Sequence, residues 1–373
     1  MCINNSVINN DERIIFNLRS LYTNYGYSQF KMSKFEEYDL YVKNKDYLMS
    51  ENIITFNDTD GKLMALKPDV TLSIIKNNDC KKGNIQKVFY NENVYRVSNS
   101  TNSFKEIMQV GLECIGDIDF YNIFEVIMLA SKSLKSISDD YVLDISNMDI
   151  ILGLIDTLGI ENKTKNKIIK AISEKSVHEI RNICFENEIN DENVDKIIKL
   201  VSLHGDTSYI ISEVKKLNIE DSKTSIANLE KILELAEING FADKLKVDFS
   251  VVDDANYYNG FVFKGFINGV SSWVLSGGQY DNLMKKMRSD YGAIGFAVYL
   301  DMLDGYCADI NKYDVENIVL YENDTDILKL NNAVSQIAND SSVMALRYVP
   351  DNIKYKTLYK ITESGVEVIE NNA

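Results

Sequence analysis

Polar side chains that could bind a small molecule alternate with other residues along the segment FKEIMQVGLECIG. Because successive side chains of a strand point to opposite faces, Gln109, Gly111 and Glu113 would share one face and the apolar residues between them the other. Gly111 leaves space that a ligand could fill. The preceding β-like run ends at Arg96, whose guanidinium suits a carboxylate or a phosphate. A carboxylate, an amide and a guanidinium on neighbouring strands indicate a site for a small zwitterion.

Structural roles for the same residues remain open at this point. Glu113 and Arg96 could form a cross-strand ion pair, with Gln109 in solvent. Tyr257 and Tyr258, which precede Asn-Gly, could add hydroxyl donors to the site or could be core tyrosines, since half-buried tyrosine is common. The residue pattern thus gives a candidate site and leaves its use undecided.

Several kinds of chemistry lack the residues they need. The chain has two histidines, His178 and His204, and neither has cysteine, histidine or paired carboxylates at ligand spacing, or a glycine-framed nucleophile nearby. Neither of the two common glycine-rich phosphate loops occurs. We therefore expect no catalytic residues of the hydrolase kind, no metal and no cofactor.

Composition limits the partners. Forty Lys and Arg residues against 56 Asp and Glu residues give the 373-residue chain a net charge of −16, which repels phosphate backbones and anionic lipid heads. The five cysteines are scattered, which argues against a disulfide framework. No apolar run approaches the length of a membrane span. We expect a cytoplasmic protein that binds neither nucleic acid nor membrane.

The elements that must position the candidate site follow from the apolar periodicity. In the first part of the chain we expect, in order, a helix over 11–27 closed by Gly26, a hairpin of strands 52–56 and 62–66 about Asp60-Gly61, a short helix with Pro68 in its first turn, antiparallel strands 86–97 and 103–116, a helix over 120–137 and a strand over 141–146. The site residues would then lie on the central pair of strands.

The residue pattern changes after residue 146. Lys- and Glu-rich amphipathic segments predict a helical insertion over 147–243. Further strands are expected at 244–252, 257–267, 271–278 and 292–299, with a closing helix over 301–307, and beyond 312 a strand, a helix and two strands. The predicted domains are a core of 1–146 and 244–311, the insertion 147–243, and a short α/β appendage, 312–373.

Five blocks of the sequence, in order, resemble the catalytic core of class II histidyl-tRNA synthetases. They span about residues 10–310 and read LMALKPDVT, KVFYNENVYR with FKEIMQVGLECIG, ANYYNGFVF, VLSGGQYDNL and YGAIGFAVYLDML. The resemblance implies an α+β class II fold, an antiparallel sheet flanked by helices, with a helical insertion. It also implies a set of histidine-binding residues: Asp69, Thr71 and Gln109 for the amino group, Glu113 and Tyr258 for the imidazole, with Tyr257 beside them and Arg96 for a free carboxylate.

Residues that serve ATP in those synthetases differ in this chain. Ser98 replaces a glutamate, and Asp253, Gln279 and Met302 replace arginines. Loss of a guanidinium that balances charge on a triphosphate costs several kcal/mol of transition-state stabilisation. A retained amino-acid site beside a dismantled ATP site is similar to the family of ATP phosphoribosyltransferase regulatory subunits.

In that family the subunit has no catalysis of its own, joins a short-form catalytic subunit in a hetero-octamer, is needed for activity and mediates feedback inhibition by L-histidine. The resemblance implies the same here. It also implies a homodimer whose seam includes the opening helix and YGYSQFKMSKFEE, where Met32-Ser33 stands in place of the family's proline. The alternatives are a divergent histidyl-tRNA synthetase and a synthetase-like histidine-binding module with another partner.

Overall fold

The computed structural model describes residues 8–43, 53–77, 83–97, 103–219, 222–252, 257–287, 289–303, 305–306, 313–362 and 365–372. Two compact units are present, Met1–Cys307 and Ala308–Ala373. Within the described residues, no helix combines the length and the apolar character needed to cross a bilayer.

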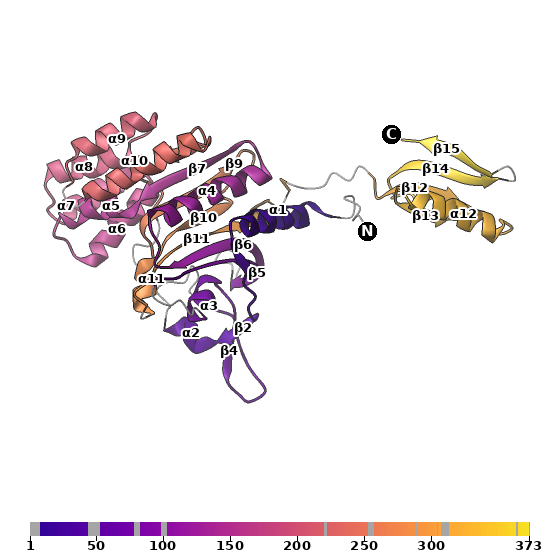
Figure 1. Ribbon diagram of the computed structural model, residues 1–373, viewed down its shortest axis with the longest axis horizontal. Helices are drawn as coiled ribbons and strands as arrows, with labels where there is room; N and C mark the ends of the chain where they lie inside the picture. Colours follow the sequence, from indigo (N-terminus) through magenta and orange to yellow (C-terminus); the bar gives the residue numbers. More distant parts are fainter. Residues whose placement is uncertain are drawn as a thin grey trace. The chain divides into compact units, whose positions relative to one another are not determined.

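An eight-stranded sheet forms the centre of the first unit (Figure 1). In spatial order its strands are β1 (Ser28–Gln29), β5 (Ile85–Val97), β6 (Phe104–Gly116), β11 (Gly292–Tyr299), β10 (Leu275–Gln279), β9 (Asn259–Ile267), β7 (Tyr141–Asn147) and β8 (Leu245–Val247). The pairs β1–β5 and β7–β8 are parallel and the other pairs are antiparallel. The predicted antiparallel pair that carries the candidate site is confirmed as β5 and β6.

Two helices cover one face of this sheet, α1 (Asn10–Asn24) and α4 (Phe120–Ile137). Both were predicted. A capping box between Asn9 and Glu12 starts α1, and Gly26, at φ +83°, follows its end. The alternate apolar side chains of β6 are buried in the same core as these helices. One face of β6 is therefore core, as its alternation predicts.

Short elements gather over the opposite face. They are α2 (Tyr38–Val42), α3 (Thr71–Lys76), α11 (Asp281–Lys286) and a three-stranded sheet of β2 (Phe35–Glu37), β4 (Leu63–Leu66) and β3 (Thr55–Asn57). The predicted hairpin about Asp60-Gly61 is confirmed by the antiparallel pair β3–β4. The position of Pro68 in a first helical turn was wrong. Helix α3 begins at Thr71, because the Asp69 carboxylate accepts a hydrogen bond from the Leu72 N–H (2.9 Å) and ends the extended chain there.

Among the described residues between β7 and β8, six α-helices gather beside that end of the sheet (Figure 1). They are α5 (Met148–Asp156), α6 (Asn162–Ser173), α7 (Val177–Glu186), α8 (Asp191–Val201), α9 (Thr207–Lys216) and α10 (Lys223–Ile238). The predicted helical character is confirmed. Their buried faces join the core cluster of the large sheet, so the boundaries of a separate insertion at 147 and 243 remain a prediction.

The end of the chain differs in two details from expectation. The closing helix predicted over 301–307 is a short 3-10 helix, η4 (Leu300–Leu303). The second unit contains β12 (Val315–Leu320), α12 (Ile327–Ala338), β13 (Val343–Leu346), β14 (Tyr355–Thr362) and β15 (Gly365–Asn371), with strand order β13-β12-β14-β15. The predicted single last strand was wrong: Gly365, at φ +138°, allows the run to fold back as the antiparallel pair β14–β15.

Candidate functional site

The predicted polar face of β6 is buried beneath α3, α11 and the small sheet. Gln109 is 3% exposed and Glu113 is 2% exposed. The register places Glu113 opposite Gly295 of β11 and Gly111 opposite Tyr90 of β5. Buried polar groups normally have hydrogen-bond partners, so the partners of these side chains show which of them the protein itself satisfies.

Glu113 lies at the centre of a hydrogen-bonded cluster. Its Oε1 accepts a hydrogen bond from Thr71 Oγ1 (2.8 Å) and its Oε2 accepts one from the Tyr280 hydroxyl (2.5 Å). A Cβ on Gly295 would lie 1.7 Å from Oε2, so the carboxylate occupies space that only a glycine leaves. Burial raises the pKa of Glu113 to about 8, although both hydrogen bonds oppose this rise.

A second carboxylate, Asp69, lies in the same site. Burial raises its pKa, and the hydrogen bond from Leu72 N–H and the charge of Arg96 offset part of the rise. Arg96 Nε donates to the Pro68 carbonyl (3.1 Å), which fixes the guanidinium beside the loop that carries Asp69. The charge of Asp69 also raises the pKa of Glu113. Two acids therefore share one buried region, an arrangement that favours a cationic ligand.

The cross-strand ion pair between Glu113 and Arg96 was the wrong alternative. The register places Arg96 opposite Lys105 and Glu113 opposite Val88. Arg96 therefore lies eight positions along β5 from the residue opposite Glu113, a distance that the two side chains cannot bridge.

Both predicted tyrosines lie at the site. The rings of Tyr257 and Tyr258 are 4.5 Å apart, and Tyr257 is 5.9 Å from the ring of Tyr280. Burial, followed by the charges of Asp69 and Glu113, raises the pKa of Tyr257 well above its ordinary value. Both side chains are half-buried, so they border the carboxylates rather than the centre of the core.

Tyr90 and Tyr280 belong to the site and were missed. A Cβ on Gly111 would lie 2.5 Å from the Tyr90 hydroxyl, so the predicted gap over Gly111 is filled by this phenol, and that prediction was wrong. For Tyr280 a signal was present in the sequence, because it stands inside the block VLSGGQYDNL. Tyr90 is identified only by the strand register, as the cross-strand partner of Gly111.

Gln109 has an unused donor. Its Nε2 is buried and, within the described part of the chain, has no hydrogen-bond partner. An amide left this way costs about 1–3 kcal/mol. The cluster of Asp69, Thr71, Gln109, Glu113 and the four tyrosines therefore combines one buried and one half-buried carboxylate with an unsatisfied amide N–H. These acceptors and this donor suit a small ligand with positive and polar groups.

Comparison with known proteins connects this geometry to a family. The family model described as histidyl-tRNA synthetase matches residues 5–303. The ATP phosphoribosyltransferase regulatory subunit of Clostridium kluyveri is 30% identical over 294 residues, covering 76% of this chain and 74% of that protein. The chain belongs to the ATP phosphoribosyltransferase regulatory subunits, within the histidyl-tRNA synthetase family. The regulatory subunit of Clostridium acetobutylicum is 26% identical and covers 98% of this chain and 94% of its own length.

Solved structures of this family share the fold. An ATP phosphoribosyltransferase regulatory subunit/histidyl-tRNA synthetase from Bacillus halodurans C matches with a TM-score of 0.77 and 23% identity, covering 94% of this chain and 93% of that one. A chain of the ATP phosphoribosyl transferase complex from Thermotoga maritima matches with a TM-score of 0.61 and 17% identity. The match covers 77% of this chain and 96% of that one. The predicted class II synthetase fold is confirmed.

Two of the positions at which the resemblance expects synthetase arginines have other uses in this regulatory subunit. Gln279 Oε1 accepts a hydrogen bond from Phe261 N–H (2.8 Å), at the irregularity between β9 and β10. Met302 packs against the main hydrophobic core. Neither side chain has a charge to offer a triphosphate. The other two substituted positions, Ser98 and Asp253, lie outside the described residues.

Proposed function

We propose that this chain is a non-catalytic regulatory subunit that a short-form ATP phosphoribosyltransferase needs for activity and through which L-histidine inhibits the first step of histidine biosynthesis. The relatives that carry this name and the matching chain of the Thermotoga maritima transferase complex support a catalytic partner. The hetero-octamer, the homodimeric core and the cytoplasmic location belong to the same proposal.

The observation that carries the proposal is the buried carboxylate of Glu113 and the half-buried carboxylate of Asp69 beside an unsatisfied amide. Histidine brings an ammonium and imidazole N–H groups, which can each donate to a carboxylate, and a carboxylate that can accept from Arg96. The resemblance assigns Gln109 to the amino group, but its unpaired Nε2 is a donor and suits the carboxylate of histidine instead. Glu113, already held by Thr71 and Tyr280, suits the imidazole. Asp69, at the start of α3, suits the ammonium. An amino acid without an imidazole leaves Glu113 buried and unpaired, which disfavours its binding.

The lack of catalysis rests on the missing cations. Gln279 and Met302 are uncharged and are used in packing. Asp253 carries a negative charge at the position of a synthetase arginine, and a negative charge repels ATP. A divergent histidyl-tRNA synthetase is the alternative that this substitution pattern disfavours.

Calorimetric titration of the full chain tests the histidine site. We expect L-histidine to bind with a Kd below about 100 µM, or about −5.5 kcal/mol. Histidinol, which lacks the carboxylate, and L-alanine, which lacks the imidazole, should each bind at least about tenfold more weakly. Absence of heat with L-histidine at about 1 mM, or equal affinities for the three compounds, would contradict the proposed site.

A further inference from the structure

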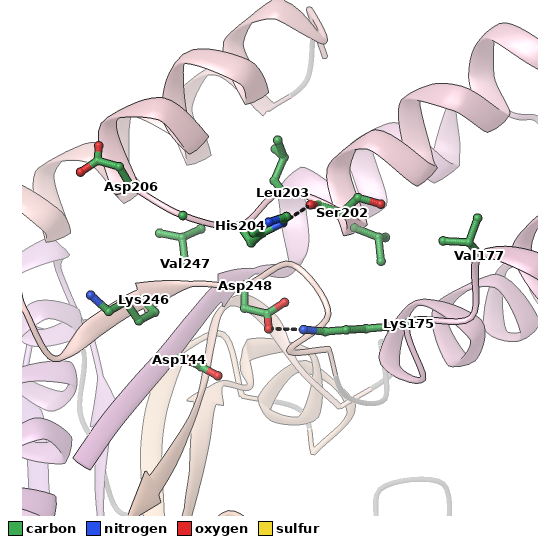
Figure 2. A pocket seen from close by; sticks show the side chains of 12 residues that line it. Asp144, Lys175, Val177, Ser202, Leu203, His204, Asp206, Lys246, Val247 and Asp248 are labelled. Atoms are coloured by element: carbon green, nitrogen blue, oxygen red, sulfur yellow. Dashed lines mark hydrogen bonds and ion pairs between the residues drawn. The ribbon is translucent and has the colours of Figure 1, made fainter. Parts of the chain in front are cut away.

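A second pocket, which we call the seam pocket, lies between the helices α6–α9 and the edge of the large sheet (Figure 2). Its volume is about 800 Å³, within the range of about 300–1,000 Å³ typical of small-molecule sites. Strands β7 and β8 form its floor with Asp144, Lys246 and Val247, and Asp248 follows β8. The turn before α7 and the loop between α8 and α9 complete the wall. No residue of the Glu113 cluster lines it.

Some charged groups of this pocket are already used to hold its walls. Lys175 Nζ pairs with Asp248 Oδ2 at 2.8 Å, which ties the turn before α7 to the sheet edge. Asp248 also accepts hydrogen bonds from the N–H and hydroxyl of Ser250 (2.8 and 2.7 Å). Asp206 caps α9 by accepting from the N–H groups of Ser208 and Tyr209. These groups are satisfied by the protein itself.

Three polar groups facing the same space are not used. The carboxylate of Asp144 makes no hydrogen bond or ion pair with any described residue, and the side chain is partly buried. Burial, followed by the nearby charge of Asp248, raises the pKa of Asp144 to about 6. Its parallel register partner Lys246 is exposed and makes no side-chain hydrogen bond or ion pair with a described residue. The charges of Lys175 and Lys246 offset part of the rise in the pKa of Asp144. His204 Nδ1 donates to the Ser202 carbonyl (2.9 Å), which leaves Nε2 available.

The free groups have a definite chemical complement. An ammonium satisfies Asp144 and relieves its repulsion from Asp248. A carboxylate satisfies Lys246. Beside Ser202 and Gly205, the rest of the lining is apolar and consists of Val177, Val201, Leu203 and Val247, which suits a hydrocarbon side chain. We propose that this pocket binds a free amino acid with a large apolar side chain, its ammonium on Asp144 and its carboxylate on Lys246.

Titration calorimetry of the full chain with L-phenylalanine tests this inference. The Glu113 cluster disfavours phenylalanine because the side chain lacks N–H donors, so the probe reports on the seam pocket. We expect saturable 1:1 binding at about 10 mM ligand, a concentration that fills about nine-tenths of a site with a Kd near 1 mM. Phenethylamine, which lacks the carboxylate, and 3-phenylpropionate, which lacks the ammonium, should bind at least about fivefold more weakly.

Variants locate the site. Asp144→Asn and Lys246→Met should each weaken phenylalanine binding about tenfold, whereas Asp243→Asn, an exposed carboxylate outside the pocket, should not change it. Because the side chain of Asp144 makes no hydrogen bond to the described residues, Asp144→Asn should fold normally and keep its affinity for histidine. No binding of phenylalanine, or binding that both pocket variants leave unchanged, would overturn the inference.

Discussion

The Glu113→Gln variant is expected to bind L-histidine at least about 100-fold more weakly than the unmodified chain, a loss near 3 kcal/mol. Glutamine keeps the shape of the side chain and still accepts one hydrogen bond, but it has no charge for an imidazole N–H. Its NH₂ group would also face Thr71 Oγ1 or the Tyr280 hydroxyl, which now donate to the carboxylate. Calorimetry with L-histidine at pH 8 measures the difference.

The same substitution should affect stability in the opposite direction. Burial raises the pKa of Glu113 to about 8, from 4.5. Between these values the folded chain retains a proton that the unfolded chain has released, so stability falls as pH rises, by at most about 1.4 kcal/mol per pH unit. Glutamine removes this loss. The free energy of unfolding of Glu113→Gln minus that of the unmodified chain should therefore rise between pH 5 and pH 8 and level off above pH 8.

A matched control is Glu106→Gln, on the same strand but exposed. Neither histidine affinity nor the pH dependence of unfolding should change in that variant. Unchanged histidine affinity in Glu113→Gln would remove Glu113 from the site. A stability difference that falls with rising pH would contradict its raised pKa.

The Gly295→Ala variant should lose histidine binding and about 3 kcal/mol or more of unfolding free energy. The added Cβ would lie 1.7 Å from Glu113 Oε2 and 2.5 Å from the backbone oxygen of Leu112. The carboxylate can rotate away only by breaking its bond to Tyr280, and the backbone oxygen belongs to the β6–β11 pair. Urea unfolding and histidine calorimetry measure the two effects.

Gly292→Ala provides the comparison on the same strand. Its Cβ would meet the side chain of Ile118 at 2.7 Å, and a half-buried side chain can move. We expect a smaller loss of stability and normal histidine affinity. Equal losses in the two variants would mean that strand β11 tolerates no added methyl group anywhere, and that Gly295 has no special relation to Glu113.

The alternation of β6 was enough to predict one apolar core face and one polar face, and left the use of the polar face open. The alternation of β6 does not predict which side chain the partner strand places over Gly111. Register depends on every contact along a pair of strands, and a shift of one residue would have turned Tyr90 to the other face. The same dependence on register decided against the ion pair between Glu113 and Arg96.

Local capping explains another difference between expectation and structure. Pro68 is typical of a first helical turn, but Asp69 accepts from Leu72 N–H and moves the start of α3 to Thr71. The same short sequence fits a helix with Pro68 in its first turn and a helix that begins at Thr71. The hydrogen bond from Arg96 Nε to the Pro68 carbonyl favours the later start. The seam pocket had no local signal, because its walls come from segments between Asp144 and Asp248 that meet only in the folded chain.

The most direct test of the proposed regulatory role is an assay of the short-form ATP phosphoribosyltransferase with and without this chain. We expect the catalytic subunit to gain at least about tenfold in activity when the chain is added, and to lose most of that gain when L-histidine is added. No gain in activity, together with histidine-dependent exchange of pyrophosphate into ATP by the chain alone, would contradict a regulatory role and identify a synthetase.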